Sequence, residues 1–447
     1  MAMFTRVAAV AFALTLTACG GEANNNSGTA ANPDDGTQLT MWVRSATDQF
    51  SQRLVDAYNK SHKNHVALTI IPNDNYLTKV GTAAGSRSLP DILASDVVYT
   101  PNYTKQGLFQ DLTADIKALP YNESIAKSHL EVASLDGKTY AVPHKLDSSV
   151  FFYNKTLFKQ AGLTMPHNPT WNQIQGFAAK LNQPGKVAGI CLRGLAGWGD
   201  NMAALDTVVN TFGGQWFNMN WKPQLTSPPF VQATNFYVNL VRKYGEPGAA
   251  SDSFNQLLTL YGQGKCAMWY DATVAATSIA TTYPDVYKQT GYALAPVKLT
   301  KSSGWLWTWA LGIPQGAPDS GAAWKFVSWA TSKQYGTLVA QKYGWSAVPP
   351  GTRTSLYNNP DYQKAAKPFA AITLESINST DPEHPTLHPV PYTGIQYVVI
   401  PQFESLGLTV AQHIAGAIAG TESVSQALQA GQSAASQYTA EQLSGGG

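Results

Sequence analysis

The chain has 447 residues, of which 13% are charged, and its formal net charge is only +2. It contains no block rich in lysine and arginine, so its charge pattern does not suit a nucleic-acid partner and we expect none. A chain of this length exceeds what one compact domain usually holds, and we therefore expect two lobes.

A short apolar run, Val7–Leu16, opens the chain behind Arg6. The run is too short to span a bilayer, but it suits the core of a signal peptide. Small residues precede Cys19, and the pattern is typical of a bacterial lipobox, in which the cysteine carries a lipid. We predict a signal peptide over residues 1–18, a flexible tether over residues 19–37 and a location outside the cytoplasm, anchored to the cell membrane through lipidated Cys19. The alternative is an ordinary cleaved signal with a chance cysteine.

The next hundred residues alternate between strand-like and helix-like segments. The predicted strands cover residues 39–43, 66–71 and 92–94, and the predicted helices are one through Phe50 and Tyr58 and one over 76–84. This alternation favours an α/β fold with a βαβ-wound, largely parallel sheet.

Later segments are predicted from turn, cap and periodicity signals. They are a turn at Asp136–Gly137, a strand over 149–153, a helix capped by Thr170 and Gln173, and helices over 229–244, 320–331 and 406–419.

Acidic residues lie at the ends of three apolar strands. Asp96 follows the run 91–94, Asp147 precedes the strand 149–153, and Asp271 ends an alternating segment that begins at Cys266. Ligands of a wound α/β sheet bind outside the carboxyl ends of its strands, so all three are candidate ligand contacts. The alternative for each one is a helix cap or a turn residue.

Three tryptophans, Trp305, Trp307 and Trp309, alternate along one further segment. In an extended strand they point to one side, and each buried indole N–H requires a partner. We expect one or two of these rings to line a cavity and at least one to pack in the core.

Two glycine-rich loops carry an aromatic ring and a guanidinium group. One holds Arg193 and Trp198, and the other holds Trp345 and Arg353. Loops concentrate ligand contacts, which makes Arg193 and Trp198 candidates. The alternative is ordinary turn chemistry with an exposed arginine.

The sequence carries no catalytic signature. It has no G-x-S-x-G elbow, no H-E-x-x-H motif and no phosphate loop followed by lysine, so we expect no enzyme, no cofactor and no metal site. Asp147 with Asp271 is the pair to test for glycoside cleavage. Cys191 and Cys266 are too few and too far apart for a zinc site, and they form either a disulfide or two buried thiols.

Several short runs, taken in order, resemble the extracellular solute-binding proteins, family 1, of carbohydrate ABC importers, the group that includes the maltose-binding protein. The runs are Leu89–Leu93, Tyr140–Pro143, Phe151–Phe158, Gly264–Met268 and Pro391–Gly394, and the similarity spans about residues 38–440. Four further runs look most like the sorbitol/mannitol-type polyol binders: Gly189–Gly194, Met268–Thr273, Trp305–Ala310 and Pro389–Gln396.

The resemblance implies a type II periplasmic-binding-protein fold, in which two α/β lobes joined by a hinge close on a ligand in the cleft between them. Lobe 1 would comprise residues 38–145 and 296–347, and lobe 2 residues 146–295 and 348–440. The ligand would be a sugar alcohol or small sugar, and the partners would be ABC permease subunits. We expect a monomer.

The resemblance also implies roles for single residues. Asp147 matches the hinge-side acid that contacts the sugar, and Asp271 lies where the family places a polar contact. Tyr397, with Tyr392 close by, falls near a late aromatic residue that stacks on sugar. Ser95 stands where the maltose-binding protein carries an aromatic ring, which favours a linear, hydroxyl-rich ligand.

The chemistry of these residues agrees with such a ligand. Carboxylates accept hydrogen bonds from adjacent hydroxyls, Arg193 donates to others, and aromatic rings cover the C–H surface. Two other hypotheses remain open: a secreted glycosidase, and a surface lipoprotein that binds a peptide or a partner protein.

Overall fold

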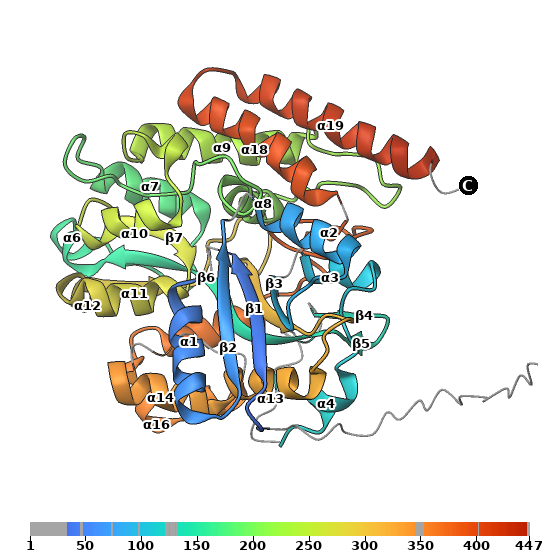
Figure 1. Ribbon diagram of the computed structural model, residues 1–447. Helices are drawn as coiled ribbons and strands as arrows, with labels where there is room; N and C mark the ends of the chain where they lie inside the picture. Colours follow the sequence, from blue (N-terminus) through green and yellow to red (C-terminus); the bar gives the residue numbers. More distant parts are fainter. Residues whose placement is uncertain are drawn as a thin grey trace, which may run out of the picture. The chain divides into compact units, whose positions relative to one another are not determined.

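Seven strands form one sheet in the order β2-β1-β3-β9-β6-β7, with β8 beside β6 (Figure 1). The computed structural model describes residues 34–44, 48–72, 75–96, 99–120, 125, 130, 133–345, 348, 353–400 and 402–444. The predicted signal peptide and Cys19 lie outside the described residues. Residues 34–37 fall within the tether predicted from composition, but hydrogen bonds hold them to Asn64. The backbone N–H groups of residues 35, 36 and 37 donate to Oδ1 of Asn64, and the backbone N–H of Asn64 donates to Oδ1 of Asp34.

The strands have the following bounds: β1 Gln38–Arg44, β2 His65–Ile71, β3 Ile92–Asp96, β4 Ser134–Leu135, β5 Lys138–Thr139, β6 Ala141–Asn154, β7 Met268–Ala272, β8 Thr290–Ala293 and β9 Leu306–Gly312.

The helices have the following bounds: α1 Asp48–Ser61, α2 Tyr76–Ser86, α3 Tyr99–Lys105, α4 Thr113–Lys117, α6 Lys155–Gln160, α7 Trp171–Leu181, α8 Asn201–Thr211, α9 Pro228–Tyr244, α10 Phe254–Gly262, α11 Val274–Thr282, α12 Pro284–Gln289, α13 Ser320–Ala330, α14 Lys333–Tyr343, α15 Thr354–Tyr357, α16 Pro360–Ala365, α17 Ala370–Ser379, α18 Phe403–Ala419 and α19 Val424–Ser444.

The sheet is mixed, which corrects the prediction of a largely parallel one. Strand β1 runs parallel to β2 and β3, and these three are the strands linked by helices α1 and α2. Strand β9 is antiparallel to β3 and β6, and β7 and β8 are antiparallel to β6. A helical crossover forces parallel pairing only between the strands it connects, so the early alternation says nothing about later strands.

Strand β6 is 14 residues long and belongs to both parts of the sheet. Its first half pairs with β9 and its second half pairs with β7 and β8. Val142 packs in the hydrophobic cluster around β1, α1 and α13, whereas Val150 and Phe152 pack in the cluster around β7 and α10. The predicted boundary between the two lobes, at residues 145 and 146, therefore falls inside this strand, and the lobe ranges stay a prediction.

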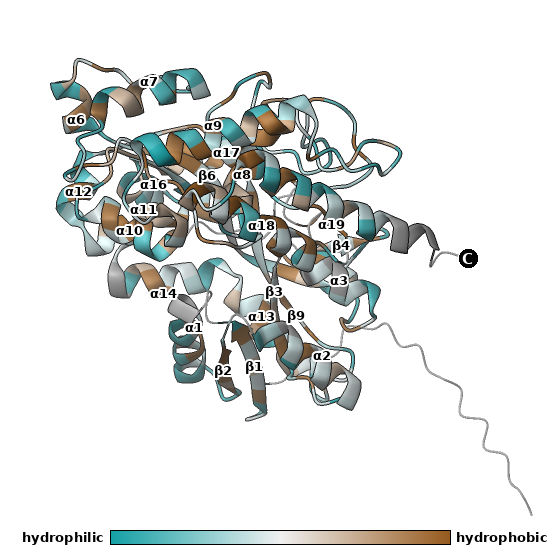
Figure 2. Cartoon of the chain, turned by 90° about the horizontal axis from the view of Figure 1, so that it is seen from above, coloured by the Kyte–Doolittle hydropathy of each residue, from teal (hydrophilic) through white to brown (hydrophobic). Residues whose placement is uncertain are grey.

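Helix α8 is buried along its whole length, against α9 and α18. In Figure 2, hydrophobic residues, drawn in brown, are present in α8, α9 and α18. Five of the eleven residues of α8 are polar, and all eleven are buried, so packing on every side holds α8 in place and with it the end of the loop that precedes it.

Local sequence signals were accurate. The capping box at Thr170 and Gln173 is present at the start of α7, and Asp136 and Gly137 both have positive φ in the turn between β4 and β5. The helices predicted over 229–244, 320–331 and 406–419 are α9, α13 and α18.

Cys191 and Cys266 form a disulfide with a Cα–Cα distance of 5.9 Å, which settles the alternative left open by the sequence. The bond lies beside two parallel bridges, from Ala188 to Cys266 and from Cys191 to Trp269. It therefore fixes the segment before Arg193 against β7.

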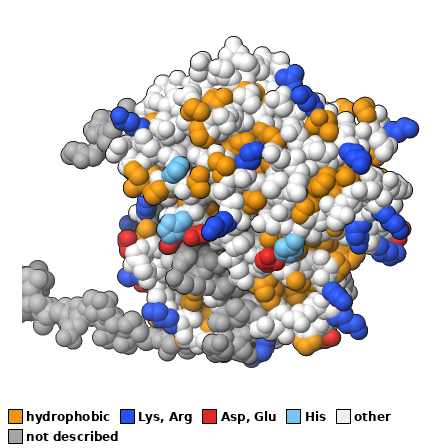
Figure 3. All heavy atoms as spheres, turned by 180° about the vertical axis from the view of Figure 1, so that it is seen from behind, with side chains coloured by type: hydrophobic (Ala, Val, Ile, Leu, Met, Phe, Trp, Pro, Cys, Tyr) orange, Lys and Arg blue, Asp and Glu red, His pale blue; other side chains and the backbone are white. Residues whose placement is uncertain are grey.

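Within the described residues, no helix is both long enough and apolar enough to cross a membrane. On the face drawn in Figure 3, lysine and arginine side chains are scattered singly or in small groups and form no continuous basic surface.

Candidate ligand-binding site

Arg193 and Asp271 form a two-pronged ion pair at the end of β7. Nε of Arg193 donates to Oδ2 of Asp271 at 2.9 Å, and Nη2 donates to Oδ1 at 2.5 Å. The Arg193 side chain is 13% exposed and that of Asp271 is not exposed at all. Burial alone would lower the pKa of the Arg193 guanidinium, but the charge of Asp271 and its hydrogen bonds raise that pKa above its ordinary value. The arginine is therefore a permanent, fixed cation.

The carboxylate of Asp271 is fully occupied by the protein. Besides Arg193, it accepts hydrogen bonds from Nε1 of Trp269 at 3.1 Å and from the backbone N–H of Ala272 at 2.7 Å. Trp269 and Asp271 are two residues apart in β7, and this hydrogen bond places their side chains on one face of the strand. Each carboxylate oxygen accepts two hydrogen bonds, which is the usual capacity of its lone pairs.

The loop from Arg193 to Asn201 holds the guanidinium group of Arg193 in position. Nη1 of Arg193 donates to the Gly199 carbonyl at 2.9 Å, and Asp200 lies 3.8 Å from the same nitrogen. A Cβ on Gly194 would lie 2.0 Å from the Ala249 carbonyl oxygen, so only glycine fits this close approach. Three of the five guanidinium N–H groups are engaged by described residues, and two remain for a ligand.

Two indoles lie next to this loop. The rings of Trp198 and Trp307 stack with centroids 5.2 Å apart and planes 10° apart. Trp309 lies 5.8 Å from Trp307, and both rings are half-buried. Trp305 is 3% exposed and packs on Tyr270 in the core, with Cζ of Arg193 5.7 Å from its ring. The expectation that at least one of the three tryptophans packs in the core is confirmed.

Three buried polar atoms beside the tryptophans have no hydrogen-bond partner among the described residues. They are Nε1 of Trp307, Oγ1 of Thr308 and Oε1 of Gln396. The amide of Gln396 is held in place because its Nε2 donates to the Leu306 carbonyl at 2.8 Å. An unsatisfied buried donor or acceptor costs about 1–3 kcal/mol, so a donor and an acceptor are available here for a hydroxyl-bearing ligand.

Strand β9 also brings two of the predicted acids into register with the tryptophans. The backbone of Asp147 pairs opposite Trp307, and that of Asp96 pairs opposite Trp309. The side chains of Asp96 and Asp147 lie outside the described residues, so their ligand contacts stay predictions.

The two predicted tyrosines lie in different surroundings. The hydroxyl of Tyr392 accepts a hydrogen bond from the Trp216 backbone at 3.0 Å, and its ring meets Phe217 edge-on at 6.3 Å. Burial raises the pKa of Tyr392 above its ordinary value. These contacts belong to the helical core and not to the Arg193 loop. Tyr397 is 4% exposed and directly follows Gln396.

Sequence reasoning missed Gln396 as a candidate. It ends the run Pro389–Gln396 on which the polyol-binder resemblance was noted, but an uncharged amide in a loop carries no signal of its own. Arg353, the other loop arginine, is structural, because it donates to the carbonyl and hydroxyl of Thr331 at 2.6 Å.

Helix α8 carries a buried acid, Asp206, which is 1% exposed. Its Oδ1 accepts a hydrogen bond from Nε1 of Trp216 at 2.9 Å, and its Oδ2 has no partner within the described part of the chain. Burial raises the pKa of this carboxyl well above its ordinary value, so the folded protein holds it as a neutral acid.

We expect Asp206 to make the protein less stable as the pH rises above about 4, because the folded state keeps a proton that the unfolded chain releases. Asp206→Asn should remove this part of the pH dependence. Urea unfolding at about pH 5 and about pH 8 measures it, with Asp285→Asn, on a side chain 87% exposed, as the control. An unchanged pH slope in Asp206→Asn would show that folded Asp206 is ionised.

Among the described residues, no three His, Cys, Asp or Glu side chains are grouped so as to hold a metal ion.

Comparison with known proteins gives consistent matches along nearly the whole chain. A profile of the family described as bacterial extracellular solute-binding protein matches residues 44–337. The mannitol-binding protein of Pseudomonas aeruginosa is 40% identical over 392 residues, which cover 85% of this chain and 88% of that protein.

Solved structures match to a similar extent. An ABC transporter solute-binding protein from Agrobacterium vitis S4 with bound D-mannitol is 43% identical, with a TM-score of 0.85, and the match covers 91% of this chain and 99% of that chain. A homologue from Agrobacterium radiobacter K84 in complex with ribitol has a TM-score of 0.79 at 22% identity and covers 91% of this chain and 100% of its own, which supports the fold alone. The two-lobed α/β fold expected from the sequence is confirmed.

Proposed function

Because this chain belongs to the bacterial extracellular solute-binding protein family, we propose that it is the substrate-binding subunit of an ABC importer and captures a sugar alcohol, with mannitol as the first candidate. Two relatives, 40% and 43% identical and each matched over most of its length, are a mannitol-binding protein and a solute-binding protein with bound D-mannitol. The structural observation that carries the proposal is the fixed guanidinium of Arg193 beside the stacked rings of Trp198 and Trp307.

The site suits a polyol because such a ligand has a hydroxyl on every carbon and loses a hydrogen bond to water at each one on burial. Arg193 and Nε1 of Trp307 donate to hydroxyl oxygens, and Oε1 of Gln396 accepts from a hydroxyl. Asp147 and Asp96 supply further acceptors, and the indole faces cover the C–H groups between the hydroxyls.

Asp271 acts through Arg193 in this proposal. Its four hydrogen bonds from the protein leave no lone pair for a ligand, so its role is to hold the guanidinium in one orientation. This differs from the direct hydroxyl contact expected from the sequence.

Capture depends on closure of the two lobes, with β6 as one strand of the hinge. A ligand that contacts both lobes stabilises the closed state through contacts that the open state lacks, and the permease then binds the closed form. The proposal keeps the lobe ranges expected from the family resemblance, about 38–145 with 296–347 and about 146–295 with 348–440.

The protein is a binder and not an enzyme in this account. A glycosidase needs one carboxyl free to give a proton and one free to attack or activate water, and the carboxylate of Asp271 is committed to structural hydrogen bonds. Incubation with labelled oligosaccharides should give saturable binding without products, and turnover would contradict the proposal.

Anchoring through Cys19 completes the proposal, because a tethered binder stays close to its permease. The family is extracellular, and a lipid on the first mature residue would hold the protein at the membrane surface. Mass spectrometry of the mature N-terminus tests this directly, since an unmodified Cys19 would rule out the anchor.

A thermal-shift screen is the first experiment. The ligands are mannitol, sorbitol, xylitol, arabitol, inositol, glucose and maltose. At one hundred times its dissociation constant a ligand adds about 2.7 kcal/mol of stability, and we expect mannitol or sorbitol to give the largest shift. A shift with maltose alone would contradict the polyol assignment.

Trp307→Ala should weaken polyol binding about tenfold to one hundredfold, since it removes both a ring face and the indole N–H. Trp307→Phe keeps a ring and should lose only the part due to the N–H. Calorimetric titration measures both, and Met219→Ala, at a position 58% exposed, is the control. Equal affinity in all three variants would remove Trp307 from the site.

A further inference from the structure

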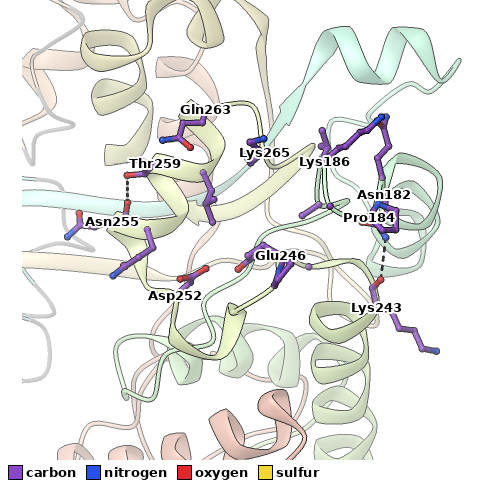
Figure 4. A pocket seen from close by; sticks show the side chains of 18 residues that line it. Asn182, Pro184, Lys186, Lys243, Glu246, Asp252, Asn255, Thr259, Gln263 and Lys265 are labelled. Atoms are coloured by element: carbon purple, nitrogen blue, oxygen red, sulfur yellow. Dashed lines mark hydrogen bonds between the residues drawn. The ribbon is translucent and has the colours of Figure 1, made fainter.

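One cavity of the protein is lined by residues other than those assigned to the polyol site. Its volume is about 880 Å³, and it is lined by residues 182–188, the end of α9 with the turn over 243–247, and α10 with its flanking residues (Figure 4). Its size lies in the range of sites for small molecules. None of Arg193, Asp271, Trp198 or Trp307 lines it.

Glu246 is the unusual residue of this cavity. It is 8% exposed, and neither of its buried carboxylate oxygens accepts a hydrogen bond from an N–H group or a hydroxyl of the described residues. The side chain that reaches it is that of Asp252, a second acid in the wall of the same cavity, so a hydrogen bond between the two requires one of them to be protonated. Figure 4 shows both side chains in its wall. A buried carboxyl whose side-chain partner is another acid is costly, so a purely structural role does not explain Glu246.

Neighbouring polar side chains are satisfied by the protein itself. Asn182 donates to the Lys243 carbonyl at 3.4 Å, and Thr259 donates to the Asn255 carbonyl at 2.9 Å, as the dashed lines in Figure 4 show. Among the described residues that line the cavity, the buried side-chain atoms that lack a donor partner are the two carboxylate oxygens of Glu246, which are acceptors. No lysine of the described chain forms an ion pair with Glu246 or Asp252, although Lys186, Lys243 and Lys265 also line the cavity.

We propose that this cavity binds a small molecule with a primary ammonium group, whose N–H donors bond to Glu246 and Asp252. An ammonium offers three donors and one positive charge, so it bonds to oxygens of both acids and takes the place of the proton that they otherwise hold. A neutral hydroxyl offers one donor and no charge, and it satisfies the same oxygens poorly.

The protonation of Glu246 provides a signature of the site. Burial, together with the charge of nearby Asp252, raises the pKa of Glu246 to about 8, and burial also raises the pKa of Asp252. The other titratable groups around Glu246 are Tyr237 and the three lysines of the cavity. The empty site therefore holds a proton near neutral pH, and an arriving ammonium displaces it, so binding tightens as the pH rises toward 8.

The test uses 4-amino-1-butanol and its neutral analogue 1,4-butanediol, titrated into the full chain by calorimetry at about pH 7 in two buffers of different ionisation enthalpy. We expect saturable binding of the amine with release of up to one proton, and at least tenfold weaker binding of the diol. Glu246→Gln should weaken amine binding at least tenfold, whereas Asp285→Asn should leave it unchanged.

Equal binding of the diol, an unchanged affinity in Glu246→Gln, or no saturable binding of the amine would each overturn the proposal. Circular dichroism shows whether Glu246→Gln folds. If this variant does not fold, the number of protons that the unaltered protein releases when the amine binds is the measurement that tests the proposal. Since Glu246 has no part in the proposed polyol site, failure here leaves the polyol result unaffected.

Discussion

Asp271→Ala is expected to destabilise the protein by about 3–5 kcal/mol, because it leaves the buried Arg193 guanidinium without its counter-charge. Polyol binding should also be lost, since a released guanidinium no longer points at the ligand. Denaturant unfolding and the mannitol-induced thermal shift measure the two effects. A direct contact of Asp271 with the ligand, which is the role expected from the sequence, would also predict loss of the thermal shift.

A double-mutant cycle separates the two explanations. Arg193→Met and Asp271→Leu each remove one charge of the pair, and the double variant replaces the buried ion pair by apolar groups. We expect the double variant to be more stable than Asp271→Leu alone, because no unpaired charge remains buried. Additive losses would show that Arg193 and Asp271 are not coupled.

Loss of the Cys191–Cys266 disulfide should cost about 4 kcal/mol of stability. The two cysteines are 75 residues apart, so the bond removes much of the conformational freedom of the unfolded chain. Cys191→Ala with Cys266→Ala, compared with the unaltered protein with and without reductant, measures the effect by urea unfolding.

The same change should weaken polyol binding, since the disulfide holds the segment before Arg193 against β7, the strand that carries Asp271. The reductant control matters because the double variant itself has no bond to reduce. If reduction destabilised the double variant as much as the unaltered protein, the effect could not come from this disulfide.

The sequence predicted elements whose signals are local. Thr170 and Gln173 form a reciprocal cap because both partners lie within one turn of helix, and Asp136–Gly137 forms a turn because both residues tolerate positive φ. The direction of β9 was not predictable in this way. Its partners β3 and β6 are more than 150 residues earlier in the chain, and no local pattern specifies that pairing.

The residues of the candidate site show the same contrast between local signals and contacts that are distant in sequence. Arg193 and Asp271 were each candidates, but their ion pair spans 78 residues and depends on the bridges that place Cys191 beside Trp269. Burial separates Trp305 from Trp307, because β9 begins at Leu306 and Trp305 precedes it, although the alternation in the sequence predicted one common face. The role of Gln396 depends on a single contact with Leu306, which composition and periodicity do not reveal.

A crystal structure of the protein with mannitol tests the central claim most directly. We predict one mannitol molecule with hydroxyls bonded to Arg193 and Gln396, its C–H surface against the indoles of Trp198 and Trp307, and Asp271 still bound to the arginine. Mannitol bound elsewhere, or bound with the Arg193–Asp271 pair broken, would contradict the account.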